Sequence, residues 1–174
     1  ITLDANNAQG TQLSSSLKEL SKLGVDTVLV GAGGTELSLG AGGMPGAGDL
    51  PSFVGAGNVT LNVDDLTQLG QAAAAAGVLD AKGIDTIQIN LAEGSDADST
   101  YGNEINALLG VANLGDLDNG MQVQLDLGGN AGVLASITEL QAEGLILNGL
   151  SFAQGDTITL DANNAQGTQL SSSL

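Results

Sequence analysis

The sequence predicts a mixed α/β fold in which repetitive strand-helix-strand units, with parallel strands, stack as an open-ended solenoid. Three observations predict this class: a long tandem repeat, segments in which apolar and polar residues alternate, and leucines at helical spacing before a glycine. The same observations allow an alternative, a β-solenoid or β-helix with short helical excursions.

The tandem repeat is the most informative of these features. Residues 1–17, ITLDANNAQGTQLSSSL, return without a change as residues 158–174, so the period is 157 residues. We interpret residues 1–157 as one full repeat and residues 158–174 as the start of the next. On this interpretation the chain is a segment of a longer array, although a deliberately designed overlap would give the same pattern. Units of this kind bury their apolar faces on neighbouring units.

Leucines spaced three and four residues apart, each series followed by a glycine, predict amphipathic helices that end before Gly24, Gly83 and Gly144. Glycine in this position accepts the left-handed conformation that terminates a helix. Ser16 and Glu19 match the capping box at the start of the first helix. These signals predict helices with defined ends.

The second helix is expected to begin after Asp64 and Asp65, because a helix start favours carboxylates. Its alanines, Ala72–Ala76, combine high helix propensity with small volume, which predicts close packing against a neighbouring element. The apolar run Ala72–Leu79 is far shorter than the ~20 residues needed to span a bilayer. We therefore expect no membrane insertion, and we expect any signal sequence or targeting region to be absent or to lie outside this segment.

Alternating apolar and polar residues predict strands with one apolar face and one polar face. These strands are expected at residues 1–5, 26–30, 59–63, 85–89, 123–127 and 158–162. Helical crossovers between successive strands require parallel pairing. Residues 31–57 are rich in glycine and hold both prolines, so we expect a loop insertion with one strand at Glu36–Leu39.

The stretch from Gly31 to Glu36 begins like a dinucleotide-binding fingerprint after a strand. Glu36 stands where the third glycine is needed, and alternating residues follow in place of a helix. We therefore predict a glycine turn between two strands and no bound nucleotide.

The phrase Gly-(Val/Ile)-Asp-Thr occurs twice and places Asp26 and Asp85 at matching positions. A carboxylate that recurs in successive units typically satisfies the same backbone groups at a turn or strand end each time. We predict a structural role for both. Asn6, Asn7, Asn62 and Asn90 are expected to form polar ladders or caps between units.

Composition excludes most chemistry. The chain has 20 acidic residues against three lysines, a formal net charge of -17, and no His or Cys. It therefore offers no imidazole base, no thiolate nucleophile and no imidazole or thiolate ligand for transition metals. The negative charge disfavours nucleic acid and anionic lipid surfaces as partners. Aromatic platforms for sugars are nearly absent, and we expect no enzymatic activity.

Oxygen ligands remain, so calcium is the one cofactor that the composition favours. The candidate ligands fall in two acidic clusters. They are Glu93, Asp96, Asp98 and Glu104 in the first, and Asp116, Asp118 and Asn119 in the second. Either cluster fits a calcium site of the low affinity that suffices in extracellular conditions, or a solvated loop tip.

Two phrases, Leu20–Val28 and Gly144–Leu160, resemble repeats in giant secreted bacterial surface adhesins and biofilm-matrix fibre proteins. Many of these acidic, cysteine-free proteins leave the cell by type I secretion, as the RTX adhesins do. The resemblance implies an extracellular, extended, multi-repeat molecule at the cell surface that calcium stabilises. The calcium-binding nonapeptide of that family does not occur in tandem here.

These observations predict a structural repeat that gives an extracellular fibre or adhesin its length and stiffness, as a scaffold at the cell surface or in a biofilm matrix. Its expected partners are neighbouring repeats of the same protein and other copies of the fibre. The alternative is a ligand-recognition module that binds a glycan or a host protein through residues 31–57.

Overall fold

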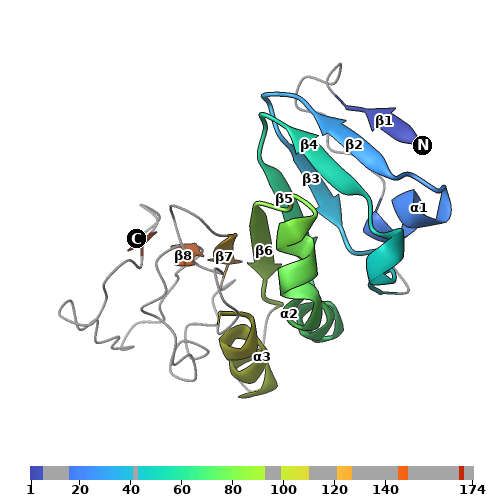
Figure 1. Ribbon diagram of the computed structural model, residues 1–174. Helices are drawn as coiled ribbons and strands as arrows, with labels where there is room; N and C mark the ends of the chain where they lie inside the picture. The colour runs from blue at the N-terminus through green and yellow to red at the C-terminus, as the bar shows by residue number, and fades with distance from the viewer. Residues whose placement is uncertain are drawn as a thin grey trace.

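The computed structural model of the chain describes residues 1–5, 16–40, 43–92, 99–109, 121–126, 145–148 and 169–170. This part is a mixed α/β structure with two parallel sheets and three α-helices, which confirms the predicted class at that level (Figure 1). The elements in chain order are β1 (Thr2–Asp4), α1 (Leu17–Lys22), β2 (Thr27–Val30), β3 (Thr35–Ser38), the 3₁₀ helix η1 (Ala47–Asp49), β4 (Ser52–Gly55), β5 (Val59–Val63), α2 (Leu66–Ala81), β6 (Thr86–Asn90), α3 (Ser99–Leu109), β7 (Gln122–Asp126), β8 (Leu145–Asn148) and β9 (Gln169–Leu170).

The strands form a three-stranded sheet of order β1-β2-β4 and a six-stranded sheet of order β3-β5-β6-β7-β8-β9. We call these the first and second sheets. Every described pairing is parallel, as predicted. Strands follow one another in chain order across each sheet, so each new strand adds to the edge left by its predecessor, and β1 and β8 lie at opposite ends of the molecule (Figure 1).

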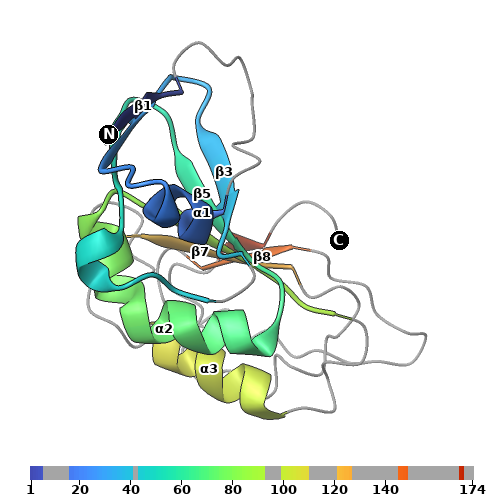
Figure 2. The same cartoon turned by 90° about the vertical axis from the view of Figure 1, so that its right-hand side faces the viewer.

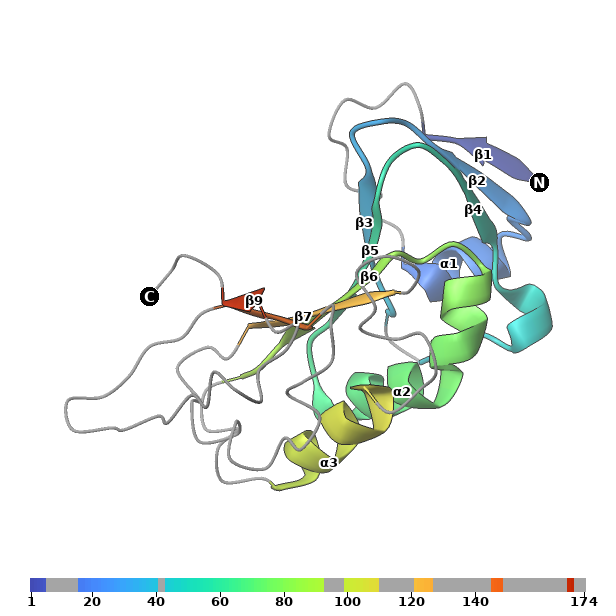
Figure 3. The ribbon, with the colours of Figure 1, turned by 60° about the vertical axis from the view of Figure 1, so that its left-hand side comes forward.

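Two short arcs join the sheets. The chain turns from β2 into β3 and again from β4 into β5, and the two arcs lie one on the other (Figure 3). The backbones are close at this point, because a Cβ on Gly34 would lie 2.6 Å from the carbonyl oxygen of Asn58. Gly34 also has a φ of 72°, which favours glycine. The predicted glycine turn between two strands is confirmed.

Apolar side chains form continuous rows on the inner face of the second sheet. In register, Leu37, Leu61, Ile87 and Val123 follow one another across β3, β5, β6 and β7. Each is at most 2% exposed. Thr60 and Thr86 pair in register on the opposite face, so alternation separates an apolar face from a polar one. Burial of such rows is the main source of stability for a parallel sheet.

The first two helices begin where the sequence predicts. Ser16 caps α1 and accepts a hydrogen bond from the backbone N–H of Glu19, whose side chain accepts from the N–H of Ser16 in return, which completes the capping box. Asp65 caps α2 by accepting a 2.7 Å hydrogen bond from the N–H of Gln68. Such caps contribute about 1 kcal/mol each.

The helices lie along the inner sides of the sheets, and α2 contacts α3 along its length (Figure 2). Three alanines of the predicted run are buried in α2: Ala72, Ala73 and Ala76. Their burial in a helix that packs against α3 is consistent with the predicted close packing. The helices thereby cover the apolar rows of the second sheet.

Residues 31–57 differ from the expectation of a loop with one strand. The segment holds β3, η1 and β4, and both strands pair with neighbours in the sheets. Four residues, Ser52–Gly55, between Pro51 and a glycine-rich turn are too few for a clear alternating pattern, which is why β4 was not predicted. The strand expected at Glu36–Leu39 is confirmed as β3, whereas the expectation of a loop is wrong for Ser52–Gly55, which forms β4 in the first sheet. The expected strand at 158–162 and the expected helix before Gly144 lie outside the described residues.

Candidate functional site: the strand-start turns

The two Gly-(Val/Ile)-Asp-Thr phrases form the same turn between a helix and a strand. We call Gly24–Thr27 and Gly83–Thr86 the strand-start turns. In the second, the N–H of Gly83 donates to the carbonyl of Asp80 at 2.9 Å, and the N–H of Ile84 donates to that of Leu79 at 3.1 Å.

In the first turn, Gly24 donates to Ser21 and Val25 donates to Leu20, both at 3.0 Å. Gly24 and Gly83 have φ values of 67° and 87°. This is the Schellman arrangement, in which a left-handed glycine ends a helix and the following apolar residue is buried.

Asp85 ties three neighbouring strands together at their starts. Its carboxylate accepts a 2.8 Å hydrogen bond from the N–H of Val59, the first residue of β5. Its own N–H donates to the carbonyl of Val59 at 2.9 Å, and its carbonyl accepts from the N–H of Gln122 at 2.8 Å. One residue thus fixes the start of β6 against β5 and β7, and sets the register of all three.

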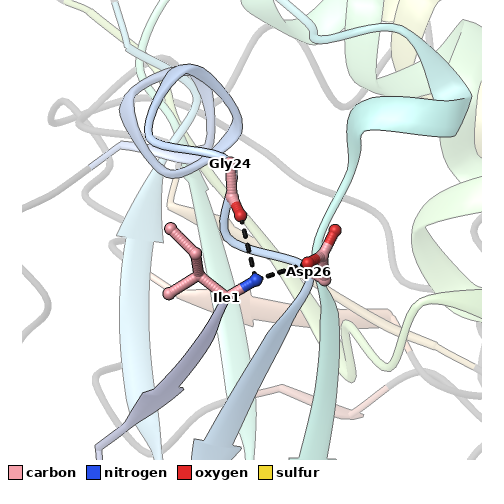
Figure 4. Close-up of polar contacts among 3 residues, drawn as sticks. All are labelled: Ile1, Gly24 and Asp26. Carbon is pink, nitrogen blue, oxygen red and sulfur yellow. Dashed lines mark hydrogen bonds and ion pairs between the residues drawn. The ribbon is translucent and has the colours of Figure 1, made fainter.

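Asp26 occupies the same position in the first sheet. Its N–H donates to the carbonyl of Ile1 at 2.8 Å, and its carbonyl accepts from the N–H of Ser52 at 2.9 Å. Its carboxylate accepts a hydrogen bond from the amino group of Ile1, which also donates to the carbonyl of Gly24 at 3.2 Å (Figure 4). The predicted structural role is confirmed for Asp85, whose carboxylate satisfies a backbone N–H. Asp26 makes the matching main-chain bonds, but its carboxylate accepts from the chain-end amino group.

The charged amino group of Ile1 lowers the pKa of the Asp26 carboxyl below its usual value, first by hydrogen bonding and then by charge attraction. Lys82 adds a smaller attraction in the same direction, against a small opposing effect of desolvation. The Asp26 side chain is 83% exposed, so solvent screens this ion pair and its contribution to stability is small.

A shallow, open hollow of about 200 Å³ lies beside Asp85. Its walls come from residues 53–59 and from Gly83 and Asp85. Its described lining holds a single carboxylate, which already accepts from Val59. The side-chain amide of Asn58, also in the lining, donates to the hydroxyl of Thr86 at 3.0 Å. The polar groups of the hollow therefore hold strands in place, and the arrangement offers no pair of convergent groups for acid–base chemistry.

Of the residues expected to bind calcium, only Glu104 lies in the described part of the chain. It is half-buried in α3, and its carboxylate faces Gly70 of α2, where a Cβ would lie 3.5 Å from the carboxyl oxygens. The other members of its cluster, Glu93, Asp96 and Asp98, and the whole second cluster, Asp116, Asp118 and Asn119, lie outside the described residues. Among the residues described, no three acidic side chains gather in a way that could hold a metal ion.

Polar links between neighbouring strands follow the predicted pattern in part. The amide of Asn90, at the end of β6, donates to the carboxylate of Asp64, just after β5, at 2.9 Å. Asn62 of β5 is in register with Gln88 of β6 on the polar face of the second sheet. The link from Asn58 to Thr86 was not predicted, because nothing in the sequence indicates which side chain faces a residue 28 positions away. Asn6 and Asn7 lie outside the described residues.

Comparison with protein-family models, with curated proteins and with solved structures finds no match to this chain. In the described part of the chain, the helices are too short or too polar to cross a bilayer, as expected. The described part of the chain is thus characterised by its geometry alone. It is a parallel α/β structure in which the polar residues of the strand-start turns hold neighbouring strands together.

Proposed function

We propose that this chain is a structural repeat of an extracellular fibre or adhesin, and that its repeats stack as an open-ended solenoid to give length and stiffness. One observation carries the proposal: buried apolar side chains run in register from β3 through β7 without a break. Stacking of this kind has no natural stop, because each parallel strand presents the same edge as its predecessor.

The duplicated sequence supports continuity from one repeat to the next. β9 lies within residues 158–174, the second copy of the opening 17 residues, and it pairs in parallel with β8. The second sheet therefore includes a strand from the second copy. In an array, this strand continues the sheet of one repeat into that of the next.

The proposal gives an expected length for each repeat. If residues 12–13 of every repeat pair as β9 does, one period of the second sheet comprises that strand and the five strands β3, β5, β6, β7 and β8. Six strand spacings of about 4.8 Å give about 29 Å per repeat. Arrays of two, three and four repeats, measured by small-angle X-ray scattering, are expected to lengthen by about this increment and to remain stiff. A flexible chain of beads would contradict the proposal.

Localisation at the cell surface is part of the proposal, and the resemblance of Leu20–Val28 and Gly144–Leu160 to repeats of secreted bacterial adhesins supports it. The net charge of -17 is consistent with fibres that repel one another until divalent cations bridge them.

We propose that the fibre depends on calcium because the two acidic clusters bind it. Isothermal titration with calcium measures it directly, and Asp96→Asn with Asp98→Asn is expected to remove the signal of the first cluster. Asp49→Asn, outside both clusters, is the matched control. Titration heats that are the same in all three proteins would contradict calcium binding at the first cluster.

One observation favours the alternative function, a recognition module. The hollow of about 200 Å³ is lined in part by Phe53–Gly57, within residues 31–57, and Val54 beside it is 56% exposed. A Val54→Asp array is expected to lose adhesion to cells or immobilised glycans if this surface binds them. Thr60→Asp, on the polar face of the second sheet, is the control. Equal adhesion of the two variants and the parent array would remove the alternative.

A further inference from the structure

The outer edge of β8 is where the chain accepts a strand of repeated sequence. In register, Ile146 of β8 pairs with Gln169, and Leu147 pairs with Leu170. These two residues of β9 have an identical pair, Gln12 and Leu13, in the first copy of the 17-residue sequence. The chain thus carries this two-residue sequence twice within an identical 17-residue segment, and the second copy pairs with β8.

We propose that the β8 edge also binds Gln12 and Leu13 of a second copy of this chain, which take the place of the molecule's own Gln169 and Leu170. Identical sequences can form the same backbone pairing with β8, so the expected intermolecular register is Ile146 with Gln12 and Leu147 with Leu13. The contact is head-to-tail, because it joins the β8 end of one molecule to the opening segment of the next. Such a heterologous contact propagates into an open filament.

The competition between the two segments sets when exchange occurs. The molecule's own segment is tethered to β8, and tethering of this kind corresponds to an effective concentration on the order of millimolar. A second molecule at micromolar concentration competes poorly, so the unmodified chain stays monomeric. Weakening the molecule's own segment, while the first copy stays intact, exposes β8 and promotes assembly.

Paired proline substitutions in the two identical segments test this directly. Successive N–H groups of a strand point in opposite directions, so substituting both residues of β9 removes the donor that faces β8. The chain with Gln169→Pro and Leu170→Pro is expected to form head-to-tail oligomers at about 100 µM, with at least a twofold rise in weight-average mass by sedimentation. The chain with Gln12→Pro and Leu13→Pro is the matched control and stays monomeric.

The chain with all four substitutions is expected to be monomeric, because it has an open β8 edge but no competent segment to fill it. Circular dichroism of each variant verifies that the helices remain. A β9 variant that stays monomeric while folded overturns the proposal. Oligomers of equal size in the four-substitution chain also overturn it, since they would not use the opening segment.

A peptide measurement keeps the test decisive if the β9 variant fails to fold. The chain has no cysteine, so Ile146→Cys introduces a single thiol on β8 of the otherwise unmodified chain. A 17-residue peptide of sequence 1–17 with cysteine in place of Gln12 is expected to form a disulfide with it at millimolar peptide. The same peptide with cysteine in place of Ala5 is the control. Equal cross-linking by both peptides, or none by either, overturns the proposed register.

This inference deepens the proposed function and rests on it, since both require stacking of parallel strands, but the two fail in different experiments. An array that behaves as flexible beads removes the stacked fibre. A monomeric, folded β9 variant in a chain whose arrays do stack removes segment exchange alone.

Discussion

The first and second sheets begin their strands in the same way but differ in how far they are enclosed. Asp26 and Asp85 make matching backbone bonds, yet Asp26 serves a short sheet that ends at β1, where Ile1 is 69% exposed. Asp85 precedes β6, an inner strand of the six-stranded sheet, and the neighbouring strands β5 and β7 both carry buried apolar side chains. The matching bonds indicate that the repeated turn sets the register of the strands. We expect stability to depend instead on how many neighbours each strand has.

The largest expected effect comes from the buried rows. Leu61→Ala removes a fully buried side chain between Leu37 and Ile87 and is expected to lower the free energy of unfolding by about 2–5 kcal/mol. Leu3→Ala, at the partly buried edge strand β1, is the matched change in the first sheet and is expected to cost clearly less. Urea denaturation measures both, and equal losses would break the comparison.

Alanine substitution of the two turn glycines distinguishes the cost of backbone strain from the cost of steric crowding. Gly83→Ala introduces a positive φ for alanine and places its Cβ 2.5 Å from the carbonyl oxygen of Phe53, so a loss of about 2–4 kcal/mol is expected. Gly24→Ala has the same conformational cost, but no atom lies within 4 Å of its Cβ, so about 1 kcal/mol is expected. Thermal denaturation of the two variants compares them. A Gly24→Ala loss as large as that of Gly83→Ala would show that crowding contributes nothing.

Removal of the Asp85 or Asp26 carboxylate is expected to destabilise the chain by a smaller amount, again more in the second sheet than in the first. Asp85→Ala leaves the N–H of Val59 without its acceptor and is expected to destabilise the chain by about 1–3 kcal/mol. Asp26→Ala, at the exposed position, is expected to cost less than Asp85→Ala. Chemical denaturation at neutral pH tests this order, and the reverse order would contradict the view that the second sheet carries the stability.

The smallest effect concerns pH. Because the pKa of Asp26 is lowered in the folded chain from 3.8, its contribution is fully present above that value and is lost as pH falls through the folded pKa. In the 174-residue chain, where Ile1 has a free amino group, the stability difference between the unsubstituted protein and Asp26→Asn is therefore expected to shrink as pH is lowered below 3.8. Denaturation of both proteins at pH values from 6 to 2 measures it. A difference that grows toward low pH would contradict the assigned ion pair.

The sequence predicted those helices and strands that depend on residues close together in the chain. The strand Val59–Val63 alternates without interruption, and the capping residues Ser16 and Asp65 act on N–H groups three residues away, so both were predicted correctly. β4 was missed because its four residues alternate too briefly between Pro51 and a glycine turn. α3 was not predicted as an element, although Tyr101, Ile105 and Leu108 recur at helical spacing before Gly110.

The sequence predicted the structural role of the two aspartates in the strand-start turns, but it did not predict which groups they bind. Recurrence of the Gly-(Val/Ile)-Asp-Thr phrase indicated that Asp26 and Asp85 satisfy backbone groups at strand starts. The identity of those groups, in Ile1 and Val59, depends on which strands become neighbours across 25 and 26 residues of chain. That choice is made by tertiary packing, which single-sequence patterns do not encode.

The thermal midpoint of arrays with one, two and three repeats of 157 residues, in one calcium-containing buffer, tests the central claim most directly. Stacked repeats share buried rows across each junction, so the midpoint is expected to rise with each added repeat. A midpoint that stays the same from one repeat to three would show that each repeat folds as an independent bead, and would contradict a continuous stacked fibre.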